Sequence, residues 1–260
     1  MLPEAVHGAA KTLWHCWTNA TRIPQLPADI RPASRADGYA IQSAVVDLFQ
    51  QQIVGWKIAA TSLAGQAHIG VDGPLVGSLM ANRVLESNAR VSLDGNYMRV
   101  GEAEFAFRFA RDLSPRAKAY TLDEVLDAVS SLHPTIEIPD SRFDDFAGVG
   151  AAQLIADNAC ACWLIVGSAA RTWRDVDLST HAVGGFMDGT LLVEGSGANV
   201  LGDPRVALAW MVNERCEFGD GVKAGELVTT GTCITPVALA PGHHFRADFG
   251  ALGELEVSFD

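Results

Sequence analysis

Residues 100–113 read VGEAEFAFRFARDL, an alternating pattern that indicates a β-strand in the middle of the chain. Ala103 and Phe105 fall on one face of this strand and point toward a core. Glu102 and Glu104 fall on the opposite face, with Cα atoms roughly 6.5–7 Å apart from the rise of a strand. Two adjacent carboxylates repel each other and raise the pKa of one of them. We therefore expect a cation beside this strand.

A third acidic residue follows in residues 135–140, which read TIEIPD. Ile136 and Ile138 face one way on a short predicted strand, and Glu137 faces the other. Three carboxylates completed by water suit Mg²⁺ or Mn²⁺ rather than zinc, because these hard cations prefer octahedral oxygen ligands. The spacing alone also fits an alternative in which the first two glutamates line the outer face of a half-exposed strand.

A lysine supplies a positive charge in residues 54–61, VGWKIAAT. Lys57 lies between Trp56 and Ile58 on a predicted strand. A lysine in this position is either an edge residue whose ammonium reaches solvent or a buried functional cation. The sequence leaves both interpretations open.

Helical patterns dominate the first fifth of the chain. Residues 4–19 have a helical pattern, and Ser34 and Asp37 form a capping box for a second helix over residues 35–51. We expect three more helices, namely one capped by Thr121 and Glu124 and ended by His133 and Pro134, one ending near Asp157, and one from Asp203 and Pro204 to about Asn213.

From Ile53 onward the pattern changes to strands separated by glycine-rich turns. Residues 61–79 are rich in glycine and polar residues, which predicts a mobile or functional loop. The predicted class is α+β, with a small helical N-terminal segment over residues 1–52. A mixed, mainly β domain is expected over residues 53–260.

Composition excludes several classes of protein. The net charge of −12 argues against a basic nucleic-acid-binding surface. Neither a signal peptide nor an apolar run long enough for a membrane span is present, so we expect no membrane association. Five cysteines without a CxxC pair predict reduced thiols and a cytoplasmic location. Cys160 and Cys162 fit small buried side chains better than soft-metal ligands.

Several motifs occur in a characteristic order along nearly the whole chain. They are GWKIAATS (55–62), GVDGPLVGSL (70–79), GEAEFAF (101–107), IEIPDSRF (136–143), DNACACWLIVG (157–167), GDPRVALAWMVN (202–213) and KAGELVTTGTCITPV (223–237). Together they resemble the 2-keto-4-pentenoate hydratase and 4-oxalocrotonate decarboxylase family of the fumarylacetoacetate hydrolase superfamily. The resemblance implies a β-roll domain of the fumarylacetoacetate hydrolase C-terminal type behind the helical segment.

The resemblance also implies roles for single residues. The family's Mg²⁺ or Mn²⁺ ligands match Glu102, Glu104 and Glu137, and its active-site lysine matches Lys57. Asp72 matches the family as well, with either a catalytic role or a structural role in a turn. His68, in the same loop, is either a residue of a lid or a solvated histidine. We expect backbone groups around Thr230, Gly231 and Thr232 to hold the substrate carboxylate, because glycine permits close approach.

The activity implied by the resemblance is a lyase reaction on a short 2-oxo-enoic acid. Hydration of 2-hydroxypenta-2,4-dienoate to 4-hydroxy-2-oxopentanoate, in aromatic catabolism, is the leading expectation. The alternatives are a 4-oxalocrotonate-type decarboxylase, an acylpyruvate C–C hydrolase and a non-enzymatic partner subunit. We also expect a homo-oligomer that associates with a related decarboxylase. Leu75 and Cys160 depart from the family pattern, which bears on the substrate and on the water-addition step.

Overall fold

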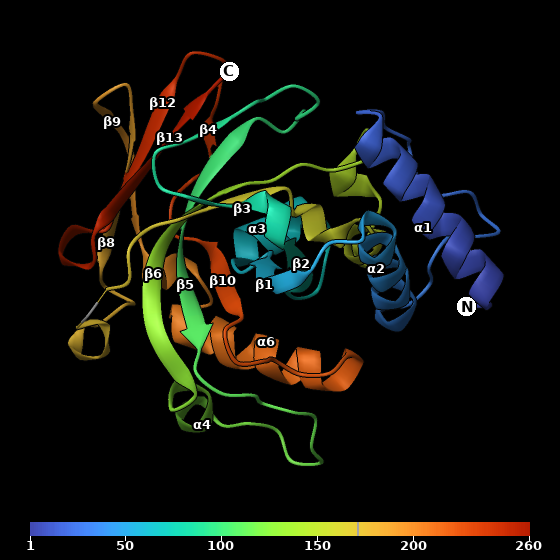
Figure 1. Cartoon of the computed structure of the whole chain (residues 1–260), viewed down its shortest axis with the longest axis horizontal. Coiled ribbons are helices and arrows are strands. Elements are labelled where there is room, and N and C mark those ends of the chain that lie inside the picture. The colour runs from blue at the N-terminus through green and yellow to red at the C-terminus, as the bar shows by residue number, and fades with distance from the viewer. Residues whose placement is uncertain (171) are drawn as a thin grey trace.

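The computed structural model describes residues 1–170 and 172–260, and it begins with two packed helices (Figure 1). They are α1 (Pro3–Thr18) and α2 (Arg35–Phe49). The capping box predicted for α2 is confirmed, because Ser34 and Asp37 exchange side-chain and backbone hydrogen bonds. The helices bury a small apolar cluster whose members include Leu13 and Ile41. Phe143 and Ala156 complete this cluster, so the helices are anchored on the second part of the chain.

A large mixed sheet forms the centre of the molecule. Its hydrogen-bonded order is β2-β1-β10-β5-β6-β7-β3, with β11 paired to β5. The strands are β1 (Ile53–Ala59), β2 (Leu75–Met80), β3 (Val84–Glu86), β5 (Val100–Phe109), β6 (Val129–Ile138), β7 (Trp163–Val166), β10 (Leu227–Thr232) and β11 (Val237–Ala238). The strand predicted over residues 98–110 is therefore confirmed as β5, which pairs with β6 on one side and β10 on the other.

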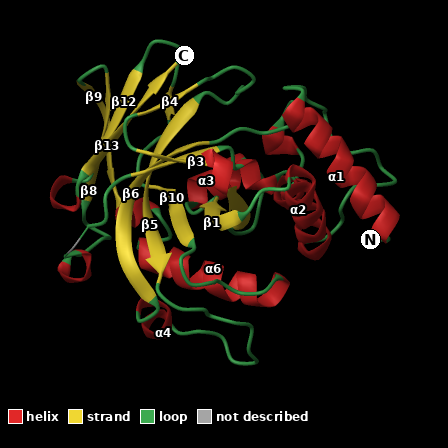
Figure 2. Cartoon of the chain, viewed as in Figure 1, coloured by secondary structure: helices red, strands yellow, loops and turns green. Residues whose placement is uncertain are grey.

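A second sheet and four further helices cover the central sheet. The second sheet has the order β4-β13-β12-β8-β9. Its strands are β4 (Ala89–Val91), β8 (Ala182–Met187), β9 (Thr190–Ser196), β12 (His244–Asp248) and β13 (Glu254–Phe259). The helices are α3 (Leu63–His68), α4 (Leu122–Leu126), α5 (Ala151–Ala156) and α6 (Pro204–Phe218). Figure 2 shows the strands gathered on one side and the centre, with α1 and α2 on the other side and α6 beneath.

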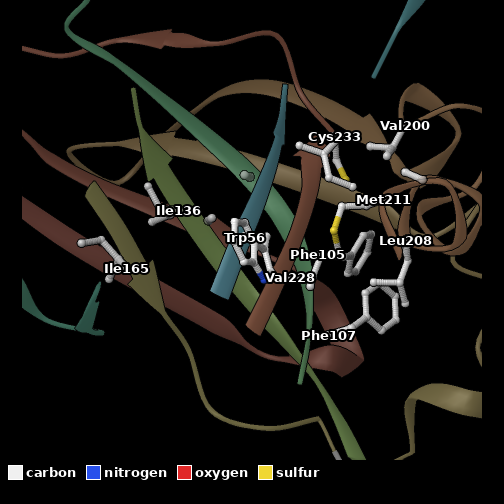
Figure 3. Packing of buried hydrophobic residues seen from close by; sticks show 14 of the residues in the cluster. Trp56, Phe105, Phe107, Ile136, Ile165, Val200, Leu208, Met211, Val228 and Cys233 are labelled. Carbon is white, nitrogen blue, oxygen red and sulfur yellow. The ribbon is translucent and has the colours of Figure 1, made fainter. Parts of the chain in front are cut away.

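The two faces of β5 divide the core, as its alternating sequence predicts. Figure 3 shows Phe105 and Phe107 on the side of Leu208 and Met211, which belong to α6. The opposite face contributes Ala106 to a separate apolar cluster with residues of β2, β7 and β10. This small cluster fills the inside of the curled sheet, next to the positions of the two glutamates. The α+β class with a mixed β-roll is confirmed, whereas the division between residues 52 and 53 stays a prediction.

The helix predicted up to His133 is wrong in its extent. Thr121 caps α4 as expected, but α4 ends at Leu126, and β6 begins at Val129. Pro134 lies inside β6, where its carbonyl accepts a hydrogen bond from the amide of Gly167 just beyond β7. Pro134 has no N–H to donate in return to Gly167, and the carbonyl of Gly167 instead lies 2.9 Å from Nδ1 of His133, so the side chain of the preceding residue takes the place of the missing ladder hydrogen bond. The apolar residues of this segment repeat at helical spacing, but those from Val129 onward belong to β6, which pairs with β5.

Residues 61–79 contain more regular structure than the predicted loop. They include α3, capped by the side chain of Ser62, and most of β2, which pairs with β1. The helix that begins at Pro204 is confirmed, and it continues to Phe218, beyond its predicted end. Among the described helices, none is both long and apolar enough to cross a membrane.

Candidate active site

Four neighbouring strands of the central sheet carry the candidate site. Lys57 of β1 is in register with Thr229 of β10, and Glu104 of β5 is in register with Thr232 of β10. Glu102 of β5 lies directly opposite Glu137 of β6. A flat sheet would separate β1 from β6 by about 14 Å, so side chains on these strands meet only because the sheet curls.

The three glutamates converge on one point. One carboxylate oxygen from each of Glu102, Glu104 and Glu137 lies within 4.8 Å of the others. Glu104 is fully buried and Glu137 is 1% exposed, whereas Glu102 is partly exposed. The alternative of a half-exposed outer face is therefore wrong for Glu104, because the curl of the sheet encloses it.

Only one of the two carboxylate oxygens of Glu104 accepts hydrogen bonds from described residues. Its Oε2 accepts a hydrogen bond from the hydroxyl of Thr229 and another, 2.9 Å long, from the amide of Gly231. Its Oε1 has no hydrogen-bond partner among the described residues, and the same holds for Oε2 of Glu137. A buried carboxylate oxygen without a partner is costly, so these two oxygens fit a site that receives a cation.

Lys57 is the cation that the described structure places at this cluster. Its side chain is buried, and Nζ lies 3.0 Å from Oε1 of Glu137. Nζ also donates a 3.0 Å hydrogen bond to the carbonyl of Ala159. The interpretation of Lys57 as a snorkelling edge residue is wrong, because the lysine faces the inside of the curled sheet.

The charges of the cluster fit a divalent cation. Burial, followed by the charge of Glu137, raises the pKa of Glu102 to about 7 and that of Glu104 well above its usual value. Although burial favours its neutral amine, the three carboxylates raise the pKa of Lys57. Three ionised carboxylates and one ammonium leave two negative charges, which one divalent cation neutralises.

A cavity of about 630 Å³ opens beside this cluster. Lys57, Glu102 and Glu104 form its polar wall. The rest of the lining is mainly apolar and comes from several elements, including Ile58, Leu75, Met98, Val100, Pro139, Phe146, Leu154 and Ile234. Short α3 lines it too, and exposed His68 lies at its edge. A cavity with one charged wall and apolar sides suits a small acid with a hydrocarbon chain.

A left-handed turn after α5 holds Lys57. Asn158, Ala159 and Cys160 all have positive φ values, between 47° and 62°. The side chain of Asn158 bonds the backbone N–H and C=O of Ser78 on β2, which anchors the turn. Non-glycine residues in this conformation are strained and persist where the surroundings require it. Here the turn directs the carbonyl of Ala159 at the lysine.

Cys160 lines the cavity at the end of this turn. Burial, followed by the negative charge of Asp157, raises the pKa of its thiol to about 12. The thiol is therefore neutral at physiological pH, and it presents a weakly polar group at this position, which departs from the family pattern.

The other predicted site residues divide into two groups. Gly231 and Thr232 line the cavity, but the amide of Gly231 is committed to Glu104. Thr230 points away from the cavity, and its hydroxyl donates to the carbonyl of Phe105. Asp72 is exposed and does not belong to the cavity lining. Strand alternation separates Thr230 from its neighbours, and the position of Asp72 before a turn separates it from the cluster.

The role of Gly231 is to allow close approach. Its φ of +99° is strained for any other residue, and a Cβ atom here would lie 1.9 Å from the hydroxyl oxygen of Thr61. The sequence reasoning missed Thr229 and Ala159, which hold Glu104 and Lys57. Thr229 was visible only as a neighbour of the predicted carboxylate-binding segment, and Ala159 acts through its backbone.

Known proteins with similar sequence and structure were compared with this geometry. No protein-family model matches the chain. The 2-keto-4-pentenoate hydratase of Burkholderia vietnamiensis strain G4 is 33% identical over 224 residues, covering 85% of this chain and 84% of that protein. The structure of 4-oxalocrotonate decarboxylase from Pseudomonas putida G7, complexed with magnesium and adipate, superposes with a TM-score of 0.91 and 27% identity, covering 100% and 99% of the two chains.

A more distant structure extends the comparison of the fold. Fumarylpyruvate hydrolase from Pseudomonas aeruginosa, in complex with Mn²⁺ and pyruvate, superposes with a TM-score of 0.57 at 16% identity, covering 78% of this chain and 88% of that one. At this identity the likeness concerns the fold alone. Both structures confirm the fold type expected from the sequence motifs.

Proposed function

Because the chain belongs to the 2-keto-4-pentenoate hydratase and 4-oxalocrotonate decarboxylase family, we propose that it is a divalent-metal-dependent hydro-lyase. Its proposed reaction is the addition of water to 2-hydroxypenta-2,4-dienoate, which gives 4-hydroxy-2-oxopentanoate. The observation that carries the proposal is the buried cluster of three glutamates with two unpartnered oxygens beside a mainly apolar cavity.

Glu102, Glu104 and Glu137 are the proposed ligands of Mg²⁺ or Mn²⁺. Their donor set consists of carboxylate oxygens, which these cations prefer, and their charge together with Lys57 matches a divalent ion. A bound divalent cation supplies Lewis-acid stabilisation of the negative charge that develops on a 2-oxo acid when it forms an enolate. Thr229 and Gly231 keep Glu104 in position for this role.

Lys57 is the proposed proton-handling and charge-neutralising residue. Its ammonium lies on the wall of the cavity, held by Glu137 and by the carbonyl of Ala159. From there it can stabilise a substrate carboxylate or hold the proton that moves between carbon atoms during the reaction. Thr232 lines the same wall and is a proposed substrate contact, with its hydroxyl proton donated to the carbonyl of Ile234.

The lining of the cavity favours hydration of a monocarboxylic substrate. 4-Oxalocrotonate carries a second carboxylate, which a second cation would neutralise, whereas the lining offers it neutral donors such as Ser62 and Asn199. Among the described residues of the lining, Lys57 is the sole lysine or arginine, and His68 lies at the exposed edge. The likeness to a 4-oxalocrotonate decarboxylase keeps decarboxylation as the second candidate.

We also propose that the chain acts in the cytoplasm as a homo-oligomer, able to associate with a related decarboxylase. All five cysteines are free thiols, which fits a reducing compartment. Leu191 and Leu192 on the edge strand β9 are 44% and 55% exposed, which fits a surface covered by another subunit.

A spectrophotometric assay with Mg²⁺ tests the proposed reaction. The enzyme is incubated with 2-hydroxypenta-2,4-dienoate, 4-oxalocrotonate or an acylpyruvate, and dienoate absorbance, CO₂ and pyruvate are followed. Loss of dienoate absorbance without CO₂ release is the expected result. Release of CO₂ from 4-oxalocrotonate at a higher kcat/KM would assign the decarboxylase reaction instead, and no turnover of any 2-oxo acid would refute the lyase proposal.

A further inference from the structure

A second cavity, of about 160 Å³, lies apart from the candidate active site. The segment that follows β6 separates the two cavities, because Pro139 lines the first and the next three residues line the second. The C-terminal end of α1 and the loop before β5 close the second cavity. None of the glutamates of the metal cluster belongs to its lining.

Three guanidinium groups line this cavity, and each lies over an aromatic ring. The ring centroids are 3.8–4.2 Å from the guanidinium carbons, in the pairs Arg22 with Tyr97, Arg83 with Trp163 and Arg142 with Trp17. Stacking engages the face of a guanidinium and leaves its N–H donors in the plane free for an anion. The rings also hold the arginines in place, so less conformational entropy is lost when they bind a ligand.

The three arginines differ in how far they are neutralised. Arg142 is ion-paired with buried Asp157. Arg22 donates from Nη2 to Asp140 at 2.8 Å, but its buried Nε has no hydrogen-bond partner among the described residues. Within the same described part of the chain, no carboxylate oxygen lies within 4.0 Å of the Arg83 guanidinium.

The acidic residues of the lining do not neutralise the charge of Arg83. Asp140 Oδ1 is already shared by Arg22 and the amides of Tyr97 and Met98. Asp94, the other acid, is exposed and faces water. Arg142 is paired with Asp157 and Arg22 with Asp140, so among the described residues of this lining Arg83 is the guanidinium without an ion-pair partner.

We propose that the second cavity binds a small oxyanion through the guanidinium of Arg83, in a lining that it shares with Arg22. The volume, about 160 Å³ against about 630 Å³ for the first cavity, limits the ligand to a few heavy atoms. The planar guanidinium of Arg83 can donate two parallel hydrogen bonds to a carboxylate or to an inorganic oxyanion. Both kinds of ligand offer two adjacent oxygens that share a negative charge.

Isothermal titration calorimetry on the metal-free full-length protein tests this site. The probes are sodium acetate, pyruvate, phosphate and sulfate at constant ionic strength, with chloride as the reference anion. Arg83→Gln removes the charge and the fork, and Arg83→Lys keeps the charge without the fork. Arg90→Gln is the matched control, because Arg90 is 72% exposed and outside both cavities.

Saturable binding of one oxyanion per chain is expected, with the affinity reduced at least tenfold in Arg83→Gln, reduced less in Arg83→Lys and unchanged in Arg90→Gln. If acetate or pyruvate binds more tightly than phosphate or sulfate, the ligand class is a carboxylate. If phosphate or sulfate binds more tightly, the ligand class is an inorganic oxyanion. Binding that equals the chloride reference, or that Arg83→Gln leaves intact, would overturn the proposal. An altered oligomeric mass of folded Arg83→Gln without oxyanion binding by the wild type would assign the arginines to a subunit contact instead.

Discussion

Glu104→Gln separates the proposed metal site from a merely structural acidic cluster. Glutamine has nearly the same shape, and its carbonyl oxygen can accept the hydrogen bonds that Thr229 and Gly231 now donate to Oε2. The change therefore removes a negative charge at the unpartnered Oε1 while the local packing is kept. Removing one partner of a buried charge pair costs about 3–5 kcal/mol, which is roughly a 100- to 4,000-fold loss of Mg²⁺ or Mn²⁺ affinity.

The same substitution has the opposite effect on the metal-free protein. The pKa of Glu104 is raised in the folded chain, because burial and the neighbouring Glu137 disfavour its ionised form. A raised pKa means that the stability contribution of this group is present below its unfolded pKa and is lost as the pH rises toward the folded pKa. Glu104→Gln does not ionise, so we expect the metal-free variant to melt at a higher temperature than the wild type at pH 8, with a smaller difference at pH 5.

Calorimetric titration with Mn²⁺ and thermal melts in EDTA measure the two effects. Glu86→Gln serves as the matched control, because Glu86 is an exposed acid at the end of β3. The reasoning is refuted if Glu104→Gln keeps its metal affinity within threefold of the wild type while the control behaves normally. A lower melting temperature of the metal-free variant at pH 8 would contradict the assigned electrostatic repulsion.

Three further predictions follow from the geometry. Lys57→Met should lower kcat at least about 100-fold while metal affinity is retained or raised, because the change removes the cation beside Glu137. Turnover assays and Mn²⁺ titrations on the same variant check this prediction. A loss of both turnover and metal affinity would count against it. Mg²⁺ affinity should rise with pH between 6 and 8, because binding displaces protons from Glu102, whose pKa is about 7, and from the other two carboxyls, whose pKa values are also raised. Calorimetric titrations across that pH range measure the affinity, and an affinity that does not change with pH would contradict the prediction. Asp72→Asn should leave kcat/KM within about threefold, because Asp72 is exposed and outside the cavity lining; a loss of 100-fold would instead show that this residue acts in the reaction.

The local alternation of the sequence predicted much of the site. The two faces of β5 were visible because strand residues alternate, and Glu137 on β6 was visible for the same reason. What alternation could not provide was the curl that brings β1 and β6 together, so Lys57 remained undecided between edge and interior. That curl depends on how β10 pairs between β1 and β5, which joins residues far apart in the sequence.

The wrong and missed predictions come from contacts between segments far apart in the sequence. Leu122 to Leu132 repeat at helical spacing, yet the second half joins β6 because its apolar face packs against β5 and the core. Such tertiary packing overrides local propensity and leaves no trace in a short apolar run. The support given to Lys57 by Ala159 comes from a backbone carbonyl in a left-handed turn, and an alanine side chain carries no signal for that role.

Anomalous diffraction from crystals soaked with Mn²⁺ tests the central claim most directly. We predict one strong peak bound by carboxylate oxygens of Glu102, Glu104 and Glu137, and no such peak in crystals of Glu104→Gln soaked in the same way. A peak elsewhere in the molecule, or a cluster that stays empty at saturating Mn²⁺, would contradict the assignment of this site as the metal centre of the enzyme.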